Sequence, residues 1–328
     1  MLKSAYIISK LKRFARRQSN KLAFLVRHLF IKDKIYYVGY NGRLNFGDDL
    51  LLDIFRRVAD TNVIFITDVW FYPNLKNERV VLGGGTIIGG EMYARAIEET
   101  ESDLCFSFWG GVIFTEYNPR WNSILRNLDV RSRSIQSSDY LISQGLVSSP
   151  GVDPAIYTSL IYGVNVERKR SLLLAPHGGY DNFDFYVSAI NYFKLVSPEI
   201  SVSIFSCSPE DDSVSEKLAT LFRVAVICGY KSIQASVSSI ASADYVISTR
   251  LHPLVVAASY EVNFLCISYS EKHLEFLATI DMADKLVGTS NFTDELYSLI
   301  SSSFNWVEVQ KKLGDVGVFY DKVKAIND

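Results

Sequence analysis

The chain has 328 residues, of which 48% are hydrophobic and 21% charged, and its formal net charge is −2. This composition excludes a disordered protein, and the length is sufficient for two α/β domains with separate cores. The charge is uneven, because residues 1–34 carry ten Lys/Arg and one Asp, a balance of +9 that leaves −11 for the remainder. An acidic body argues against a nucleic acid partner.

The basic segment comes first in the chain. Residues 1–33 interleave apolar residues with Lys and Arg, without the uninterrupted apolar length of a membrane span and without a cleavage site. We expect one or two amphipathic basic helices. Two interpretations remain open: a foot on the anionic inner face of the cytoplasmic membrane, or a helix that packs on the protein with a solvated basic face.

Downstream, short β-rich runs alternate with stretches of helical length, which predicts parallel sheets with crossover helices. In the first half we expect strands at 35–39, 63–66, 80–82 and 104–108, and helices at 49–59, 89–98, 120–128 and 137–144. The stretch 147–170 contains Pro150-Gly151 and Asp153-Pro154, turn signals typical of a crossing between domains.

The second half repeats this alternation. We expect strands at 172–175, 202–206, 223–227, 245–248 and 264–267, with a long helix at 184–196 and further helices between the later strands. The pattern predicts an α/β protein of two doubly wound Rossmann-like domains facing a cleft, residues 34–165 and 166–328. The last helix is a candidate to cross back to the first domain.

The four cysteines are Cys105, Cys207, Cys228 and Cys266, and they are far apart in the sequence. Three lie in apolar strand-like runs, so we expect buried core thiols and not a disulfide framework. With four histidines and no paired ligand spacing, we predict no bound metal. This usage fits a reducing cytoplasm.

The most informative motif is the run Thr249–Pro253, TRLHP, between the strand 245–248 and a helix over 254–258. Ligands bind at the carboxyl edge of open α/β sheets, and a helix N-terminus there favours an anion. Arg250 can fork onto a phosphate or carboxylate, while His252 can move a proton near neutral pH. For the motif alone, a solvated arginine and a capping histidine are the favoured interpretation, because the motif is short.

Two earlier loops also follow strands. Asn45, Asp48 and Asp49 precede or begin a helix, where an acid caps the helix or binds the hydroxyls of a sugar. Gly84 and Gly85 follow the strand 80–82, where glycine permits either a tight turn or close approach to a ligand. The glycine run is neither a dinucleotide fingerprint nor a P-loop.

Taken in order, these motifs resemble the polysaccharide pyruvyltransferase family over residues 35–280. The series comprises Asn45–Leu50, Gly83–Gly85, Arg133 with Ser137 and Gly145, Asp153–Ala155, the TRLHP turn and Ile267–Lys272. The resemblance implies a GT-B-like fold, with an acceptor side at 34–165 and a donor side at 166–328. It also implies transfer of a pyruvyl group from phosphoenolpyruvate to two hydroxyls of a sugar, in a surface polysaccharide or its lipid-linked precursor. No cofactor beyond this co-substrate is implied.

The resemblance also implies roles for individual residues. Arg133, Arg250, Lys272 and Thr249 would hold the donor, His252 would be the general acid beside Arg250, and Asn45, Asp48, Asp49, Gly84 and Gly85 would bind the acceptor. This chain has Ser134 where relatives have an acid after the arginine, which removes a partner that would orient Arg133. Arg131 is therefore a competitor for the same role.

Two alternatives remain from other classes of function. A GT-B glycosyltransferase that uses a sugar nucleotide has the same two-domain cleft, and fold does not determine function. A catalytically silent saccharide-binding member is the other. In each case we expect a cytoplasmic protein, peripheral at the inner face of the cytoplasmic membrane if the basic segment binds lipid.

Overall fold

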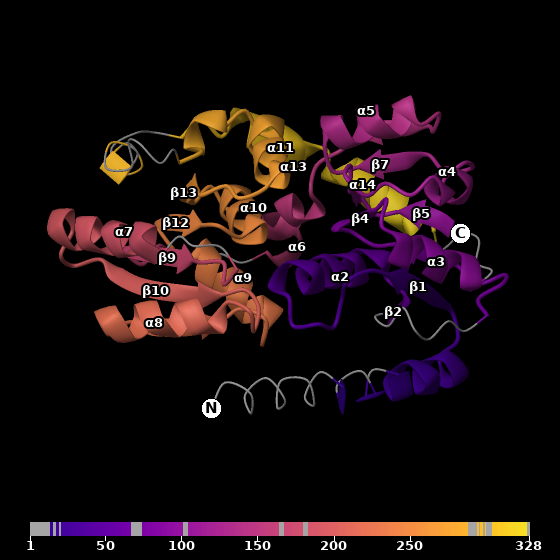
Figure 1. The fold of residues 1–328 in the computed structure, drawn as a ribbon, viewed down its shortest axis with the longest axis horizontal. Coiled ribbons are helices and arrows are strands. Elements are labelled where there is room, and N and C mark those ends of the chain that lie inside the picture. Colours follow the sequence, from indigo (N-terminus) through magenta and orange to yellow (C-terminus); the bar gives the residue numbers. More distant parts are fainter. Residues whose placement is uncertain are drawn as a thin grey trace.

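A computed structural model describes residues 14–15, 18–19, 21–66, 74–100, 104–163, 167–179, 183–287, 294, 296–297, 299 and 304–326. Residues 1–13, 16–17 and 20, about half of the predicted basic segment 1–33, lie outside this described part. Two parallel sheets organise the molecule and lie side by side along its long axis (Figure 1).

The first sheet has the order β2-β1-β3-β5 and is parallel throughout. Its strands are β1 (Lys34–Val38), β2 (Asn62–Ile66), β3 (Val80–Leu82) and β5 (Leu104–Ser107), with crossover helices α2 (Phe46–Ala59) and α3 (Glu91–Glu99). Beyond it are β4 (Thr86–Ile88), β6 (Gly111–Val112), α4 (Arg120–Ile124), β7 (Val130–Ser132), α5 (Ile135–Ser143) and β8 (Ser148–Pro150). The chain order reverses between β1 and β3, which makes that position a topological switch point.

The second sheet has the order β11-β10-β9-β12-β13, also parallel, and its switch point lies between β9 and β12. The strands are β9 (Ser171–Ala175), β10 (Ser201–Ser206), β11 (Ala225–Cys228), β12 (Tyr245–Ser248) and β13 (Asn263–Cys266). The helices are α7 (Phe183–Val196), α8 (Asp212–Phe222), α9 (Ile233–Ala241), α10 (Leu251–Ser259) and α11 (Glu271–Thr279). Short helices η1 (Pro154–Tyr157) and α6 (Thr158–Tyr162) connect the sheets, and η2 (Ala283–Lys285) follows α11.

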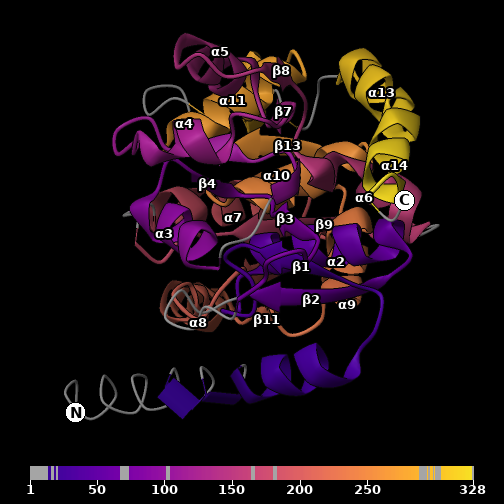
Figure 2. The same cartoon turned by 90° about the vertical axis from the view of Figure 1, so that its right-hand side faces the viewer.

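Among the described residues, one hydrophobic cluster belongs to the first unit alone and a second runs through both units. Phe46 of α2 meets Phe205 of β10 edge-on, with ring centroids 5.2 Å apart. After α13 (Val307–Gly314), the last helix α14 (Val316–Lys324) lies against the first unit, where Phe319 packs on Trp109 and Tyr157 at 5.0 and 4.8 Å (Figures 1 and 2). The boundary predicted at residue 165 stays a prediction.

The expected strands are present within two residues at each end, whereas several helix ends differ. Helix α2 begins at Phe46, three residues before the predicted start, because the Asn45 side chain caps it by accepting a hydrogen bond from Gly47 N. Helix α10 begins at Leu251, so Pro253 is its third residue and not its first. The short strands β4 and β6 were not predicted, since two or three residues give no periodic signal.

The described part of the basic segment contains a helix over residues 21–30. It packs on the first unit through Phe24, whose ring lies 6.1 Å from that of Tyr36, and through His28, whose Nδ1 lies 2.6 Å from the Tyr36 hydroxyl. None of the described helices is long and apolar enough to cross a membrane.

Candidate active site

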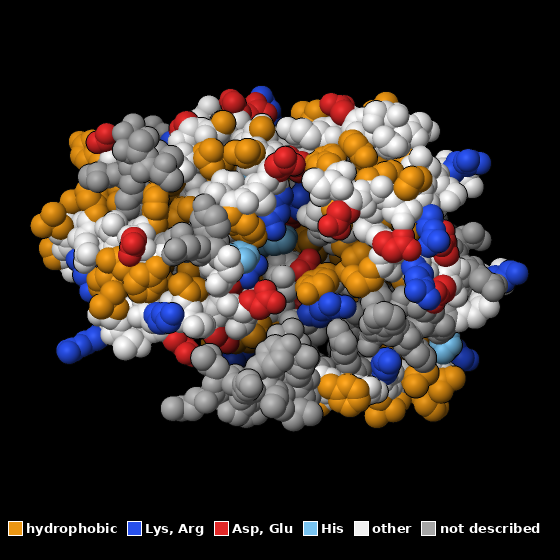
Figure 3. Space-filling view, viewed as in Figure 1, with side chains coloured by type: hydrophobic (Ala, Val, Ile, Leu, Met, Phe, Trp, Pro, Cys, Tyr) orange, Lys and Arg blue, Asp and Glu red, His pale blue; other side chains and the backbone are white. Residues whose placement is uncertain are grey.

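A cavity of about 360 Å³ lies where the carboxyl ends of both sheets meet. It is a hollow near the middle of the face in Figure 3, with histidine and Lys/Arg atoms in its floor. Its lining comes from both switch points and comprises Tyr40, Asn45, Phe46, Gly47, Asp48, Gly85, Thr86, Ile87, Met92, Tyr93, Arg133, Cys207, Arg250, Leu251, His252, Pro253 and Lys272. The size and position are those of a small-molecule site in a doubly wound fold.

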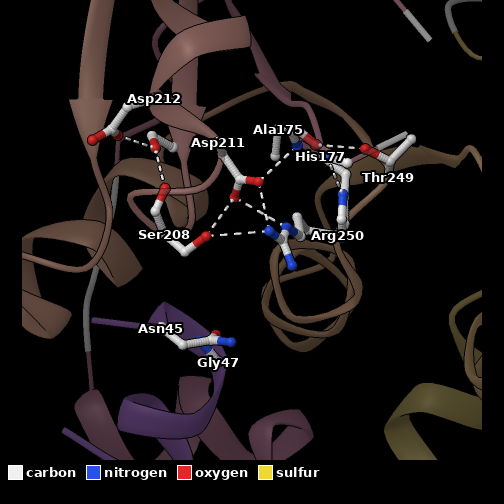
Figure 4. A network of polar contacts seen from close by, with 12 residues as sticks. Asn45, Gly47, Ala175, His177, Ser208, Asp211, Asp212, Thr249 and Arg250 are labelled. Carbon is white, nitrogen blue, oxygen red and sulfur yellow. Dashed lines mark hydrogen bonds and ion pairs between the residues drawn. The ribbon is translucent and has the colours of Figure 1, made fainter. Parts of the chain in front are cut away.

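Arg250 is held by a carboxylate that the sequence analysis did not identify. Its Nε and one terminal nitrogen donate to Asp211 at 3.0 and 2.5 Å, and the same terminal nitrogen donates to the Ser208 hydroxyl at 3.2 Å (Figure 4). Asp211 is fully buried, and its carboxylate also accepts from Gly178 N at 2.8 Å. This network fixes the guanidinium at the cavity wall, and the arginine's third nitrogen points away from Asp211 in Figure 4.

Gly178 has a steric reason to be glycine. A Cβ there would lie 1.8 Å from the carbonyl oxygen of Glu210, so a side chain would push apart the loops after β9 and β10. The close approach brings Asp211 under Arg250. The sequence did contain a signal for this pair: Asp211 follows β10 and Arg250 follows β12, so both lie at the carboxyl edge of the same sheet.

Arg133 is oriented by an acid from a distant helix. Its Nη2 lies 3.8 Å from Glu275 of α11 and donates to the Thr86 hydroxyl at 3.3 Å. Glu275 thus supplies an acidic partner for Arg133, although Ser134 stands where the sequence analysis looked for one. Of the two competing arginines, Arg133 lines the cavity and Arg131 does not.

His252 lies on the first turn of α10 and packs directly on the first turn of α2. A Cβ on Gly47 would lie 1.9 Å from the His252 Nδ1, so only glycine leaves room for the ring. Behind the ring, Nε2 lies 3.7 Å from Asp153 Oδ2, and neither atom has a hydrogen-bond partner among the described residues. Burial lowers the pKa of His252 from its usual value to about 4, against the attraction of Asp153.

The pKa of Asp48 is displaced in the opposite direction from that of His252. Burial, and then the charge of neighbouring Asp49, raises the pKa of Asp48 to about 7. Lys272 and Arg133 oppose this shift. One Asp48 oxygen would lie 2.9 Å from a Cβ on Gly85, which has φ +94°, so glycine is required there both by conformation and by space. Two groups with displaced pKa values therefore face one cavity.

The structure brings most of the predicted site residues together but not three of them. Asn45, Asp48, Gly85, Arg133, Arg250, His252 and Lys272 line the cavity. Thr249 does not, because its side chain turns inward to bond Tyr186 and the Ala175 carbonyl. Asp49 instead accepts from Gly42 N at 2.7 Å, and Gly84 N is bonded to the buried Tyr37 hydroxyl at 2.9 Å.

One wall of the cavity is more apolar and was not predicted. Tyr40, Ile87, Met92 and Tyr93 form it, on the side of the first unit. The Arg43 guanidinium lies 4.3 Å from the centroid of the Tyr40 ring at the edge of this wall. A cavity with a cationic side and an aromatic side suits a ligand pair of which one is anionic and the other carries C–H faces.

Comparison with protein families gives a match to the model described as polysaccharide pyruvyl transferase, over residues 45–271. The chain belongs to this family. The match covers more than half of the chain and includes all the cavity residues except Tyr40 and Lys272. No curated protein matches the chain.

Solved structures place the pyruvyl transferase chain among GT-B-like proteins. UDP-N-acetylglucosamine 2-epimerase from Rickettsia bellii is 11% identical with a TM-score of 0.58, covering 89% of this chain and 95% of that one. The S. aureus protein MnaA, solved with UDP, is 7% identical with a TM-score of 0.55, covering 89% and 98%. The Methanocaldococcus jannaschii UDP-GlcNAc 2-epimerase, solved with UDP-GlcNAc and UDP, is 10% identical with a TM-score of 0.53, covering 87% and 99%. At these identities the likeness concerns the fold alone, which is two Rossmann-like units about a cleft.

Proposed function

We propose that the protein transfers a pyruvyl group from phosphoenolpyruvate to two hydroxyls of a sugar, forming a cyclic ketal and inorganic phosphate. The observation that carries the proposal is the convergence of Arg133, Arg250 and Lys272 on one cavity with His252. The donor bears a carboxylate and a phosphate on the same carbon. Cations from three separate elements suit such a compact polyanion.

The donor lies at the cationic side in this proposal. Arg250 binds one anionic group through the nitrogen that Asp211 leaves available, and Arg133 binds the other from the opposite unit. Lys272 adds charge and lies with its Nζ 5.3 Å from the centroid of the Tyr269 ring. Because both arginines are already held by buried carboxylates, little side-chain entropy is lost when the donor binds.

In this proposal, His252 and Asp48 are the residues that transfer protons. His252 is uncharged in the empty cavity at neutral pH, and a polyanionic donor beside it raises its pKa while Asp153 stabilises the imidazolium from behind. His252 then protonates the methylene carbon, which makes the central carbon electrophilic. Asp48 takes the proton of the attacking hydroxyl. The first hydroxyl oxygen bonds to the central carbon, and the second hydroxyl oxygen then bonds to the same carbon as the C–O bond to phosphate breaks. The two hydroxyls lose two hydrogens in total, of which one is balanced by the new methyl hydrogen and the other leaves on inorganic phosphate.

The acceptor lies against the wall of the first unit. Asn45 and Asp48 hydrogen-bond a pair of sugar hydroxyls, and the Tyr40 and Tyr93 side contacts the apolar face of the sugar ring. We place this sugar in a surface polysaccharide or its lipid-linked precursor, at the cytoplasmic face of the membrane. No further cofactor enters this scheme.

Incubation with phosphoenolpyruvate and candidate acceptor oligosaccharides tests the proposal. We expect phosphate release that depends on the acceptor, and a product with an acid-labile pyruvate ketal. Arg250→Ala and His252→Gln are expected to lower the rate by at least about a hundredfold. Turnover of UDP-sugars, with none of phosphoenolpyruvate, would overturn the proposal in favour of a glycosyltransferase.

A further inference from the structure

The helix over residues 21–30 exposes an apolar face to solvent. Phe30 is 79% exposed, Leu29 71% and Leu22 64%, and Leu25 and Val26 belong to the same group. These positions, 22, 25, 26, 29 and 30, have the spacing i, i+3, i+4, i+7 and i+8, which places all five on one side of an α-helix. Such a contiguous apolar surface is unusual on a soluble protein and indicates a partner.

This face is not the one that holds the helix on the protein. Phe24 and His28 make the contacts with Tyr36, and they lie on the opposite side of the helix. In Figures 1 and 2 the helix lies along the outside of the first unit, below β1 and β2. Apolar side chains gather over it at the lower right of Figure 3. The apolar face is therefore outward.

The charges around the apolar face have one sign. Residues 21–32 contain three Lys/Arg side chains, namely Lys21, Arg27 and Lys32, and no acid. On a helical wheel of 3.6 residues per turn, Lys21 and Arg27 fall on opposite flanks of the apolar stripe. An apolar stripe with a cation on each flank matches the boundary between lipid headgroups and acyl chains.

We infer that the face formed by Leu22, Leu25, Val26, Leu29 and Phe30 docks on an anionic lipid surface, with Lys21 and Arg27 at the headgroups. The helix would lie in the plane of the membrane and not cross it. A second copy of the chain fits less well as the partner. Residues 1–34 of each copy have a charge balance of +9, and these like charges would repel each other across the interface.

Sedimentation of the full chain with vesicles tests this inference. We expect it to sediment with vesicles of phosphatidylcholine and phosphatidylglycerol, and much less with phosphatidylcholine alone. The double variant Leu29→Ser/Phe30→Ser should bind at least about tenfold more weakly, because two large apolar side chains no longer enter the lipid. Arg27→Gln should bind about fivefold more weakly.

A matched control uses apolar side chains elsewhere that are also more than half exposed. Leu195 is 79% exposed and Leu221 57%, on helices of the second unit. Leu195→Ser/Leu221→Ser should bind vesicles as the unaltered chain does. Equal melting temperatures of the two double variants would show that both are folded.

Several outcomes would overturn the inference. They are no sedimentation of the unaltered chain, equal affinity for both vesicle types, or an equal loss in the two double variants. A dimer in light scattering that Leu29→Ser/Phe30→Ser dissociates, without vesicle binding, would assign the face to a second copy. None of these results depends on the pyruvyl transfer reaction.

Discussion

Replacing Gly47 by alanine tests whether the start of α2 positions His252. The added Cβ would lie 1.9 Å from Nδ1 and 2.5 Å from Cγ and Cε1 of the His252 ring. Ordinary contact begins near 3.4 Å, so the ring must move by about 1.5 Å. Gly47 lies in a helix without positive φ, and alanine suits its backbone, so the strain falls on the histidine.

The expected result is a large loss of activity in a folded protein. Displacing a catalytic group by about 1 Å costs on the order of a hundredfold in rate, while overpacking of this kind costs about 1–3 kcal/mol in stability. Phosphate release from phosphoenolpyruvate with acceptor measures the first, and urea unfolding measures the second. Donor affinity should change much less than the rate, since Arg133, Arg250 and Lys272 are not displaced.

Gly317→Ala is the matched control. A Cβ on Gly317 of α14 meets nothing within 4 Å, so this variant should keep full activity and gain about 0.5–1 kcal/mol of stability. The reasoning would be refuted by a Gly47→Ala protein whose rate equals that of the control. In that case the position of His252 would not limit the reaction.

Three further predictions follow from the charges in the cavity. Folding raises the pKa of Asp48 to about 7, so the protonated carboxyl favours the folded state and this stabilisation is lost as the pH rises from about 4 to 7. In urea unfolding, the Asp48→Asn protein should therefore be more stable than the unaltered chain by at least about 1 kcal/mol at pH 8 and equally stable below pH 4. A gain in stability that is independent of pH would contradict this. Asp211→Ala leaves Arg250 without its buried partner, so the free energy of unfolding should fall by about 3 kcal/mol, whereas a loss below about 1 kcal/mol would show that the pair is not needed. The protein should take up protons when phosphoenolpyruvate binds at pH 7, since the anion raises the pKa of His252. Calorimetry in buffers of different ionisation enthalpy measures this uptake, and identical heats would argue against it.

Much of the fold was predictable because its signals are local. Each strand of the two sheets has an apolar run. The TRLHP turn lies between a strand-like run and a helix-like run, which is enough to place it at the edge of a sheet. The sequence also predicted two domains facing a cleft, and the loops after β1, β3 and β12 lie at the carboxyl ends of strands in the two separate sheets that border it. Strands as short as β4 and β6 gave no such signal.

The partners of the site residues were not predictable, because they depend on packing between distant segments. Asp211 lies 39 residues from Arg250, and Glu275 reaches Arg133 from α11. Side-chain direction was the other gap. Thr249 follows a strand as Arg250 does, yet it points into the core while Arg250 points into the cavity. A sequence places both residues at the edge without distinguishing these directions.

Thermal unfolding with and without phosphoenolpyruvate, in the unaltered chain and in Arg250→Ala, tests the central proposal most directly. A donor at about one hundred times its Kd stabilises the native state by about 2.7 kcal/mol, which raises the melting temperature by several degrees. We expect this shift in the unaltered chain and its loss in Arg250→Ala. No shift with saturating phosphoenolpyruvate, together with a shift from a UDP-sugar, would contradict pyruvyl transfer as the function of this cavity.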